Sequence, residues 1–480
     1  MRQRVQYLWI ALALPIATAL AVAQSTGTPP TSPGGGAAAS ARAEQGTRGG
    51  AKGLPDVDFR RVVRAAKDRV FPAVVFVKCI RENLEGGRKE SNEVSGSGVL
   101  ISADGELITN WHVVDKAIEI RCLLYDGRAT EADLIGTDKD TDLALLRLKL
   151  PPGTSLPHAV LGDSTALVEG DFVMAMGAPW GLSRSVSIGI VSCTRRYLPE
   201  NSEYSLWLQS DCAISPGNSG GPLVNTVGEV VGITARGYTV GGDLGFAIPA
   251  ETVRIIIDSI REHGFVNWTW YGLQLQPLRD FNRNTYFEGD AGVIVSGTDP
   301  ESPARHAGLL PRDRILSANG KPLTAMTEED LPAVRSWLGL LPKDEPVKLE
   351  VQRGDERLEI SVTPRAKGKV EGEEYDCKRW DMTVKAINQF DTPAQYFYRK
   401  EGVFIFGLKH PGNASSARLA ENDILLAIDG HDVVTLADVQ ERHEAALADI
   451  ATNHRVVLTV MRNGLQRQVV LDFARDYERE

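Results

Sequence analysis

The sequence predicts a mostly β fold that ends in a duplicated β-rich α+β unit, and two observations lead to this prediction. Short apolar runs separated by glycine and aspartate turns continue to Pro249, a pattern typical of antiparallel sheets. Beyond it, the segments around Ile315 and Val347 recur 109 residues later, around Ile424 and Val456. A repeat of this length indicates two copies of one domain, because the repeats of solenoids are shorter.

The composition is that of a globular protein with several domains. A chain of 480 residues is too long for one ordinary core, so two to four domains are expected. The net charge of −10 gives no reason to propose nucleic acid or an anionic membrane as a partner. The five cysteines have no CxxC spacing, so no zinc site is indicated. Most are expected to be buried thiols, with a disulfide between Cys193 and Cys212 as the alternative.

The N-terminal segment has the features of an export signal. Arginines at positions 2 and 4 precede a mostly apolar stretch, residues 8–20, and residues 21–23 have the small-x-small pattern of a cleavage site. An uncleaved membrane anchor is the alternative, but the stretch is short and Pro15 interrupts it. Residues 1–23 are therefore predicted to be a signal peptide. Residues 24–56, rich in Gly, Ala, Pro, Ser and Thr, are predicted to be a flexible leader.

The first folded domain is predicted to span residues 57–265. It begins with a helix whose apolar residues, from Phe59 to Val70, share one face. Strands follow, including a hairpin with an Asp-Gly turn at 104–105. The domain ends with a helix at 250–263 and a stop at Gly264.

Three residues of this domain have the types that nucleophilic catalysis requires. Ser219 lies in the glycine-rich run 215–223, His112 follows the hairpin, and Asp142 precedes an apolar strand. A serine hydroxyl needs an imidazole to take its proton and a carboxylate to orient that imidazole. The chain order His, Asp, Ser matches the chymotrypsin-like double β-barrel and differs from the subtilisin and α/β-hydrolase orders, which argues against a lipase or esterase.

The motifs around these residues resemble those of the HtrA/Deg serine proteases. The resemblance rests on the segments 109–114, 141–146, 217–223 and 244–249, in the right order, and it covers roughly residues 57–475. It implies an exported serine endopeptidase that cleaves unfolded or misfolded proteins in quality control and the stress response. It also implies a homotrimer or larger assembly, and it identifies the two C-terminal copies as PDZ domains at 266–367 and 368–476.

The same resemblance suggests further site residues. The backbone N–H groups of Gly217 and Ser219 are expected to form the oxyanion hole. Ala213 occupies the position where trypsin-like enzymes specific for Lys or Arg carry an acid, so cleavage after small or aliphatic residues is expected. Ile233, Thr234 and Ala235 are expected to form the wall of the specificity pocket. No cofactor and no metal is expected.

The two PDZ copies differ in the loop that would hold the carboxylate of a peptide. The first carries Tyr271, Gly272 and Leu273, which match the loop pattern, and is expected to bind C-terminal peptides. The second carries Asp381 where glycine is expected. A carboxylate at that place would repel the carboxylate of a ligand, so a role in spacing or assembly is expected instead.

An alternative from another functional class stays open at this stage. The chain could be an exported PDZ adaptor or chaperone with an unused protease fold. The presence of His112, Asp142 and Ser219 favours the enzyme, and hydrolysis of unfolded casein separates the two hypotheses.

Overall fold

The computed structural model describes residues 58–179, 184–238 and 244–478. The predicted signal peptide and leader lie outside the described residues. Within the described part, no helix is long and apolar enough to cross a membrane. All five cysteines are free thiols, so the alternative of a Cys193–Cys212 disulfide is not realised.

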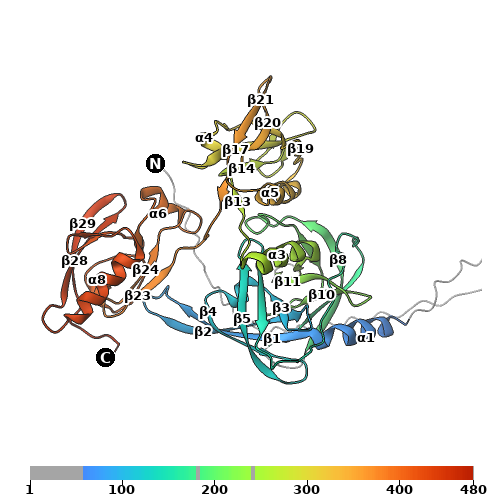
Figure 1. Ribbon diagram of the computed structural model, residues 1–480, viewed down its shortest axis with the longest axis horizontal. Coiled ribbons are helices and arrows are strands. Elements are labelled where there is room, and N and C mark those ends of the chain that lie inside the picture. Colours follow the sequence, from blue (N-terminus) through green and yellow to red (C-terminus); the bar gives the residue numbers. More distant parts are fainter. Residues whose placement is uncertain (1–57, 180–183, 239–243, 479–480) are drawn as a thin grey trace, which may run out of the picture. The chain divides into compact units, whose positions relative to one another are not determined.

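The first part of the described chain is helix α1 (Phe59–Val70) followed by a closed six-stranded barrel (Figure 1). Its strands pair in the order β1-β2-β3-β6-β5-β4. They are β1 (Val74–Asn83), β2 (Glu90–Leu100), β3 (Glu106–Thr109), β4 (Ala117–Leu123), β5 (Ala129–Asp138) and β6 (Leu143–Leu148). A short helix, α2 (Trp111–Val114), follows β3.

A second closed barrel follows, with strands in the order β10-β11-β12-β9-β8-β7. They are β7 (Phe172–Gly177), β8 (Ser185–Arg196), β9 (Trp207–Ser210), β10 (Pro222–Asn225), β11 (Val230–Tyr238) and β12 (Leu244–Pro249). The mostly β double-barrel fold predicted from the sequence is therefore confirmed.

Helix α3 (Ala250–His263) joins the two barrels through its apolar face. Val253, Ile256, Ile257 and Ile260 are buried, and the helix contacts β5 and β6 of the first barrel and β11 of the second. The helix ends at Gly264, which has φ +78° and donates its N–H to the carbonyl of Ile260. The helix bounds agree with those predicted from the apolar spacing and the glycine stop.

The first C-terminal repeat is a sheet in the order β14-β17-β18-β20-β21, with β19 paired to β18. Its strands are β14 (Leu273–Gln276), β17 (Val293–Thr298), β18 (Arg314–Ala318), β19 (Lys321–Pro322), β20 (Val347–Arg353) and β21 (Glu356–Val362). Helices α4 (Pro303–His306) and α5 (Leu331–Gly339) complete it. Two small strand pairs, β13 (Thr269–Trp270) with β22 (Arg365–Ala366) and β15 (Arg279–Asp280) with β16 (Thr285–Tyr286), accompany the sheet.

The second repeat has the same strand order, β24-β25-β26-β28-β29, with β27 paired to β26 and one additional strand, β23, on the outer side of β24. Its strands are β23 (Glu374–Cys377), β24 (Met382–Ala386), β25 (Val403–Leu408), β26 (Ile424–Ile428), β27 (His431–Asp432), β28 (Arg455–Arg462) and β29 (Leu465–Asp472). Its helices are α6 (Pro393–Tyr398), α7 (Asn413–Ser416) and α8 (Leu436–Ala448).

Buried interactions repeat between the two copies along with the strand order. Arg353 forms a two-pronged ion pair with Asp313 in the first copy, and Arg462 forms the same pair with Asp423 in the second. Two equivalent aspartates, both 1% exposed at the side chain, therefore keep the same guanidinium partner. The sequence period thus corresponds to a duplicated structure.

Candidate active site

His112 and Asp142 form a direct pair at the edge of the first barrel. The imidazole Nδ1 lies 2.8 Å from Asp142 Oδ2 and 3.0 Å from Oδ1, and the backbone N–H of His112 donates to the same carboxylate at 3.0 Å. Asp142 is 4% exposed, whereas the His112 side chain is 38% exposed. A buried carboxylate thus holds Nδ1 and leaves the opposite ring nitrogen available for proton transfer.

The backbone of Asp142 is as constrained as its side chain. Its φ is +57°, a left-handed conformation that is unusual for a residue other than glycine. Its carbonyl accepts hydrogen bonds from the Trp111 N–H at 3.1 Å and from Asn110 Nδ2 at 3.0 Å, so the turn is attached to the start of α2. Asp140, the neighbouring acid, points elsewhere and forms an ion pair with Lys367 at 2.7 Å.

Ser219 lies in the loop between β9 and β10 of the second barrel. Its hydroxyl donates to the carbonyl of Ala235 at 3.1 Å. In the described residues, no hydrogen bond joins Ser219 to His112. Catalytic hydrogen bonds are often absent or long in ligand-free sites and tighten when substrate binds.

The same loop presents backbone donors near Ser219. Gly217 has φ +99°, and in the described chain the N–H groups of Gly217 and Ser219 form no hydrogen bond. Neighbouring N–H groups are used, since Asn218 donates to Ser215 and Gly220 donates to Thr234. Two uncommitted N–H groups in an otherwise bonded turn can donate hydrogen bonds to an oxyanion.

Ser97 on β2 was missed by the sequence reasoning, although its polar groups contact the loop of Ser219. Its fully buried hydroxyl donates to the Gly217 carbonyl at 2.6 Å and accepts from the Ala178 N–H at 2.9 Å. Its backbone N–H donates to the Ser219 carbonyl at 2.7 Å. Ser97 therefore connects the first barrel with two segments of the second. No local sequence signal distinguishes it from the other serines of β2.

The two barrels approach closely at the glycines that follow Ser219. A Cβ atom on Gly220, which has φ +84°, would lie 2.1 Å from the Ser97 carbonyl oxygen. A Cβ atom on Gly221 would lie 2.2 Å from the carbonyl oxygen of Met176. A larger residue at 220 would push the loop away from the first barrel, and one at 221 would collide with strand β7 of the second barrel, so both glycines are required by contact distance.

Two known domain families and several curated proteins are similar to this chain in sequence. The trypsin-like peptidase domain family matches residues 96–233, and the PDZ domain family matches residues 294–353. A probable periplasmic serine endoprotease DegP-like from Halomonas elongata is 33% identical over 400 residues, which cover 81% of each chain. A protein of the same name from Marinomonas sp. is 36% identical over 377 residues, 77% of each chain. The chain belongs to the DegP-like serine endoprotease family.

Solved structures of related proteases resemble this DegP-like chain over about two thirds of its length. The HtrA-type protease AlgW with a tripeptide has a TM-score of 0.56 at 32% identity and covers 64% of this chain and 97% of its own. The same protease with a decapeptide has a TM-score of 0.55 at 30% identity and covers 65% of this chain. The chain is thus a serine endopeptidase with a trypsin-like domain and a PDZ domain.

The residues expected to line the specificity pocket of this DegP-like protease have different surroundings. Ala213 is exposed, and its carbonyl accepts from Ser187 Oγ at 2.8 Å. Ala235 contacts the Ser219 hydroxyl through its carbonyl. The Thr234 hydroxyl lies 2.7 Å from the Asn218 carbonyl and fixes the loop. The Ile233 side chain is fully buried in the hydrophobic core.

The segment just before Asp142 is attached to the chain on both sides of the first repeat. Asp138 accepts from Trp268 Nε1 at 2.9 Å and from the Thr141 N–H at 3.1 Å. Asp140 pairs with Lys367, as described above. Trp268 and Lys367 precede and follow the first repeat, so both ends of that repeat are bonded to the turn that carries Asp142.

Asp138 has an unusual acidity at this place. Burial raises the pKa of its carboxyl to about 6, and the neighbouring Asp140 charge adds to the effect, while hydrogen bonds from Thr141 and Trp268 and the charge of Lys367 oppose it. This carboxyl, four residues before Asp142 in the chain, therefore titrates between the acidic and the neutral range.

The carboxylate loop of the first repeat has free donors and an adjacent cavity. Gly272 has φ +69°, and a Cβ atom there would lie 2.2 Å from Ser302 Cβ. In the described residues, the N–H groups of Tyr271 and Gly272 form no hydrogen bond. A cavity of about 240 Å³ is lined by residues of the first repeat, among them 269–273, and also by residues from outside it, which are Glu203, Tyr204, Lys367 and Phe390. These features suit a peptide end.

The equivalent loop of the second repeat corrects the expectation about Asp381. Its φ of +56° matches Gly272, and its carbonyl accepts from the Lys409 N–H as that of Gly272 accepts from Asp299. The carboxylate, however, is 4% exposed and accepts from the Asn413 N–H at 2.8 Å, with Lys409 Nζ at 3.6 Å. It serves as an internal hydrogen-bond acceptor beside Lys409, so it is not a free charge that would repel the carboxylate of a ligand.

Replacing the buried hydroxyl of Ser97 should impair turnover. Ser97→Ala leaves the Gly217 carbonyl and the Ala178 N–H without their partner, a cost of about 2–3 kcal/mol in stability. It also frees the loop that carries Ser219. We expect kcat on a chromogenic peptide to fall about tenfold with little change in KM. Ser95→Ala, on the same strand, is the control, and equal kcat values for the two variants would contradict this role.

The raised pKa of Asp138 predicts a pH-dependent stability. A carboxyl whose pKa is about 6 when folded and near 3.8 when unfolded binds more protons in the folded state between these values. The stabilising contribution of this carboxyl to the free energy of unfolding is therefore present below about pH 4. It is lost as the pH rises through 6, by up to roughly 3 kcal/mol. Relative to the parent, Asp138→Asn should gain stability between pH 4.5 and 7 in urea unfolding.

The exposed carboxylate of Asp133, on the same strand, supplies the control for this measurement. Asp133→Asn should shift the unfolding free energy by the same amount at both pH values. If Asp138→Asn also shifted the unfolding free energy by the same amount at pH 4.5 and at pH 7, the Asp138 carboxyl would be ionised throughout this range.

Proposed function

We propose that this chain is an exported endopeptidase that cleaves unfolded or misfolded proteins through Ser219, His112 and Asp142. The observation that supports this most directly is the buried Asp142 carboxylate on His112 Nδ1, in the same site as the Ser219 loop with its uncommitted N–H groups. The names of the relatives support a periplasmic location, and residues 1–23 are proposed to be the signal peptide that directs export and is then cleaved.

The proposed reaction begins when the Ser219 hydroxyl leaves the Ala235 carbonyl and turns to His112 Nε2. His112 then takes the hydroxyl proton as Oγ attacks the peptide carbonyl, and Asp142 stabilises the imidazolium. His112 gives this proton to the leaving amine, and an acyl-enzyme forms. Water repeats the sequence with the same base and restores the hydroxyl.

The oxyanion of each tetrahedral intermediate is proposed to accept hydrogen bonds from the N–H groups of Gly217 and Ser219. The Ser97 hydroxyl on the Gly217 carbonyl supports this geometry because it fixes the preceding part of the turn. Losing one such donor raises the barrier by roughly 3–4 kcal/mol in comparable enzymes.

The domain limits 57–265, 266–367 and 368–476 and the leader 24–56 remain part of this proposal. The first repeat, through Tyr271, Gly272 and Leu273, is proposed to bind the free C-terminus of substrate peptides and to regulate cleavage. A homotrimer or larger homo-oligomer is proposed from the family resemblance. An exported adaptor without activity is less well supported, because the His112–Asp142 geometry is intact.

Ser219→Ala should abolish casein hydrolysis while the protein stays folded. The nucleophile is lost, so kcat should fall about a million-fold, to the background that binding and the oxyanion donors sustain. Ser215→Ala, an exposed serine in the same loop, is the matched control and should keep parental activity. An adaptor would show no casein hydrolysis in the parent either.

Cleavage should occur after Val, Ala or Ile and not after Lys or Arg. No carboxylate stands at position 213 to pair with a cationic side chain, and desolvating an unpaired charge is costly. Mass spectrometry of casein fragments measures this preference directly. Ala213→Asp should shift cuts toward Lys and Arg, and a parent that already cuts there would refute the proposed pocket.

A further inference from the structure

The two repeats differ in the edge of the strand that follows the carboxylate loop. In the first repeat this strand, β14, pairs with β17 on one side only. In the second repeat its equivalent, β24, pairs with β25 on one side and with β23 on the other. PDZ domains bind a peptide by adding it as a strand to such an edge. The edge that is open in the first repeat is occupied in the second.

The strand β23 has the direction that an added peptide would have. It is antiparallel to β24, with Glu374 opposite Lys385 and Cys377 opposite Met382. Its C-terminal end therefore reaches the loop 378–381, where the end of a ligand would lie. It also contacts α8, the helix equivalent to α5 of the first repeat. Figure 1 shows β23, β24 and α8 together in the second repeat.

Alternate side chains of β23 fill the space under α8. The Cys377 side chain is fully buried in the core of the repeat. The Tyr375 hydroxyl lies 2.9 Å from Nδ1 of His443 on α8, and the two rings meet edge to face at 5.5 Å. His443 is itself 2% exposed, and its other nitrogen donates to the Lys378 carbonyl at 2.8 Å. Residues two apart on a strand face the same side, as a bound ligand requires.

One donor of the carboxylate loop is also used internally. The N–H of Trp380 donates to the Cys377 carbonyl at 3.1 Å. The equivalent N–H in the first repeat, that of Tyr271, forms no hydrogen bond in the described chain. The Cys377 carbonyl thus takes a donor that a terminal carboxylate would need.

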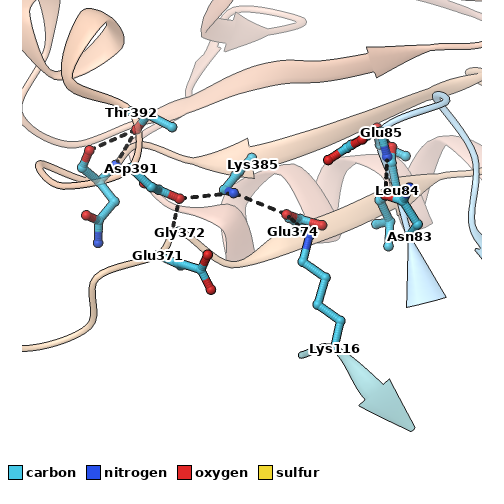
Figure 2. A network of polar contacts seen from close by, with 12 residues as sticks. Asn83, Leu84, Glu85, Lys116, Glu371, Gly372, Glu374, Lys385, Asp391 and Thr392 are labelled. Carbon is cyan, nitrogen blue, oxygen red and sulfur yellow. Dashed lines mark hydrogen bonds and ion pairs between the residues drawn. The ribbon is translucent and has the colours of Figure 1, made fainter. Parts of the chain in front are cut away.

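Ion pairs hold the other end of β23, as Figure 2 shows. The Lys385 ammonium on β24 is buried between the carboxylates of Glu374 at 3.2 Å and Asp391 at 3.0 Å. Glu374 also pairs with Lys116 at 2.7 Å, and Asp391 accepts from the Gly372 N–H at 3.1 Å. A buried charge that loses its partner is costly, so this end of β23 is not easily lifted.

We propose that the groove of the second repeat is a peptide site already bound by residues 374–377 of its own chain. This inference rests on the proposed PDZ character of that repeat. The second repeat therefore takes no free C-terminus, and each chain offers one receptor site, in the first repeat.

Hydrogen exchange on the full-length Ser219→Ala protein tests the occupancy without any ligand. Amides of residues 382–386 should exchange at least tenfold more slowly than those of residues 273–276, because β24 is bonded on both edges. A decapeptide ending in Val with a free carboxylate should then slow exchange at 273–276 and leave 382–386 unchanged. Fast exchange at 382–386 that slows with the peptide would overturn the proposal.

Titration of the same protein with the labelled decapeptide measures stoichiometry, expected to be one peptide per chain. A Glu374→Ala, Tyr375→Ala variant removes both anchors of β23 and should speed exchange at 382–386 and reveal a second site. Tyr398→Ala is the control, because Tyr398 is an exposed residue of α6. It should change neither the exchange rate at 382–386 nor the number of peptides bound. Protection at residues 455–472 shows that the variant repeat is folded.

The outcomes separate this inference from the function of the first repeat. A parent that binds no peptide contradicts the receptor role of the first repeat, while the ligand-free exchange still decides the occupancy of the second. A parent that binds two peptides with equal affinity contradicts the occupied groove and leaves the first repeat as a receptor.

Discussion

The hydrogen bonds of one buried serine hydroxyl connect the parts from which the active site is assembled. His112 and Asp142 belong to the first barrel and Ser219 to the second, so their relative positions depend on contacts between barrels. Ser97 supplies such contacts, to the Gly217 carbonyl, the Ser219 carbonyl and the Ala178 N–H. The glycine at 220 allows the close approach of the barrels that these bonds need. A neutral, fully satisfied hydroxyl fixes this junction without the desolvation cost of an ion pair.

The sequence predicted those features that depend on local pattern. The strands and turns and helix α3 with its glycine stop follow from the spacing of neighbouring residues. The duplication followed from the 109-residue period, and the double barrel from the order of His112, Asp142 and Ser219 and from the family resemblance. The pairing of His112 with Asp142 followed from their motifs and chain order. Ser97 was missed because its partners lie 81 and 120 residues away in sequence. A serine on a strand has no local signature that reveals such partners.

The fate of Asp381 shows why a correct alignment can give a wrong physical argument. Its backbone occupies the place of Gly272, as the alignment predicted. In the first repeat Gly272 faces Ser302, and a Cβ on this glycine would collide with the Cβ of Ser302. In the second repeat Asp381 faces Gly412, which has no Cβ and so leaves room for that of Asp381. The glycine thus lies on opposite sides of this contact in the two repeats. In the second repeat the Asp381 carboxylate also accepts a hydrogen bond from the Asn413 N–H in the following turn. The direction of a side chain depends on this distant partner, which a single loop motif does not include.

The attachment of the turn before Asp142 bears on where the chain can be shortened. Lys367 and Glu371 lie after the first repeat, yet they pair with Asp140 and Lys139, which immediately precede Asp142. A fragment that ends at the last strand of the first repeat would lack both partners. Ending the chain where the sheet of the first repeat ends would therefore remove ion pairs next to Asp142. A truncated enzyme that retains residues through Glu371 keeps both ion pairs, and one that ends before Lys367 loses both.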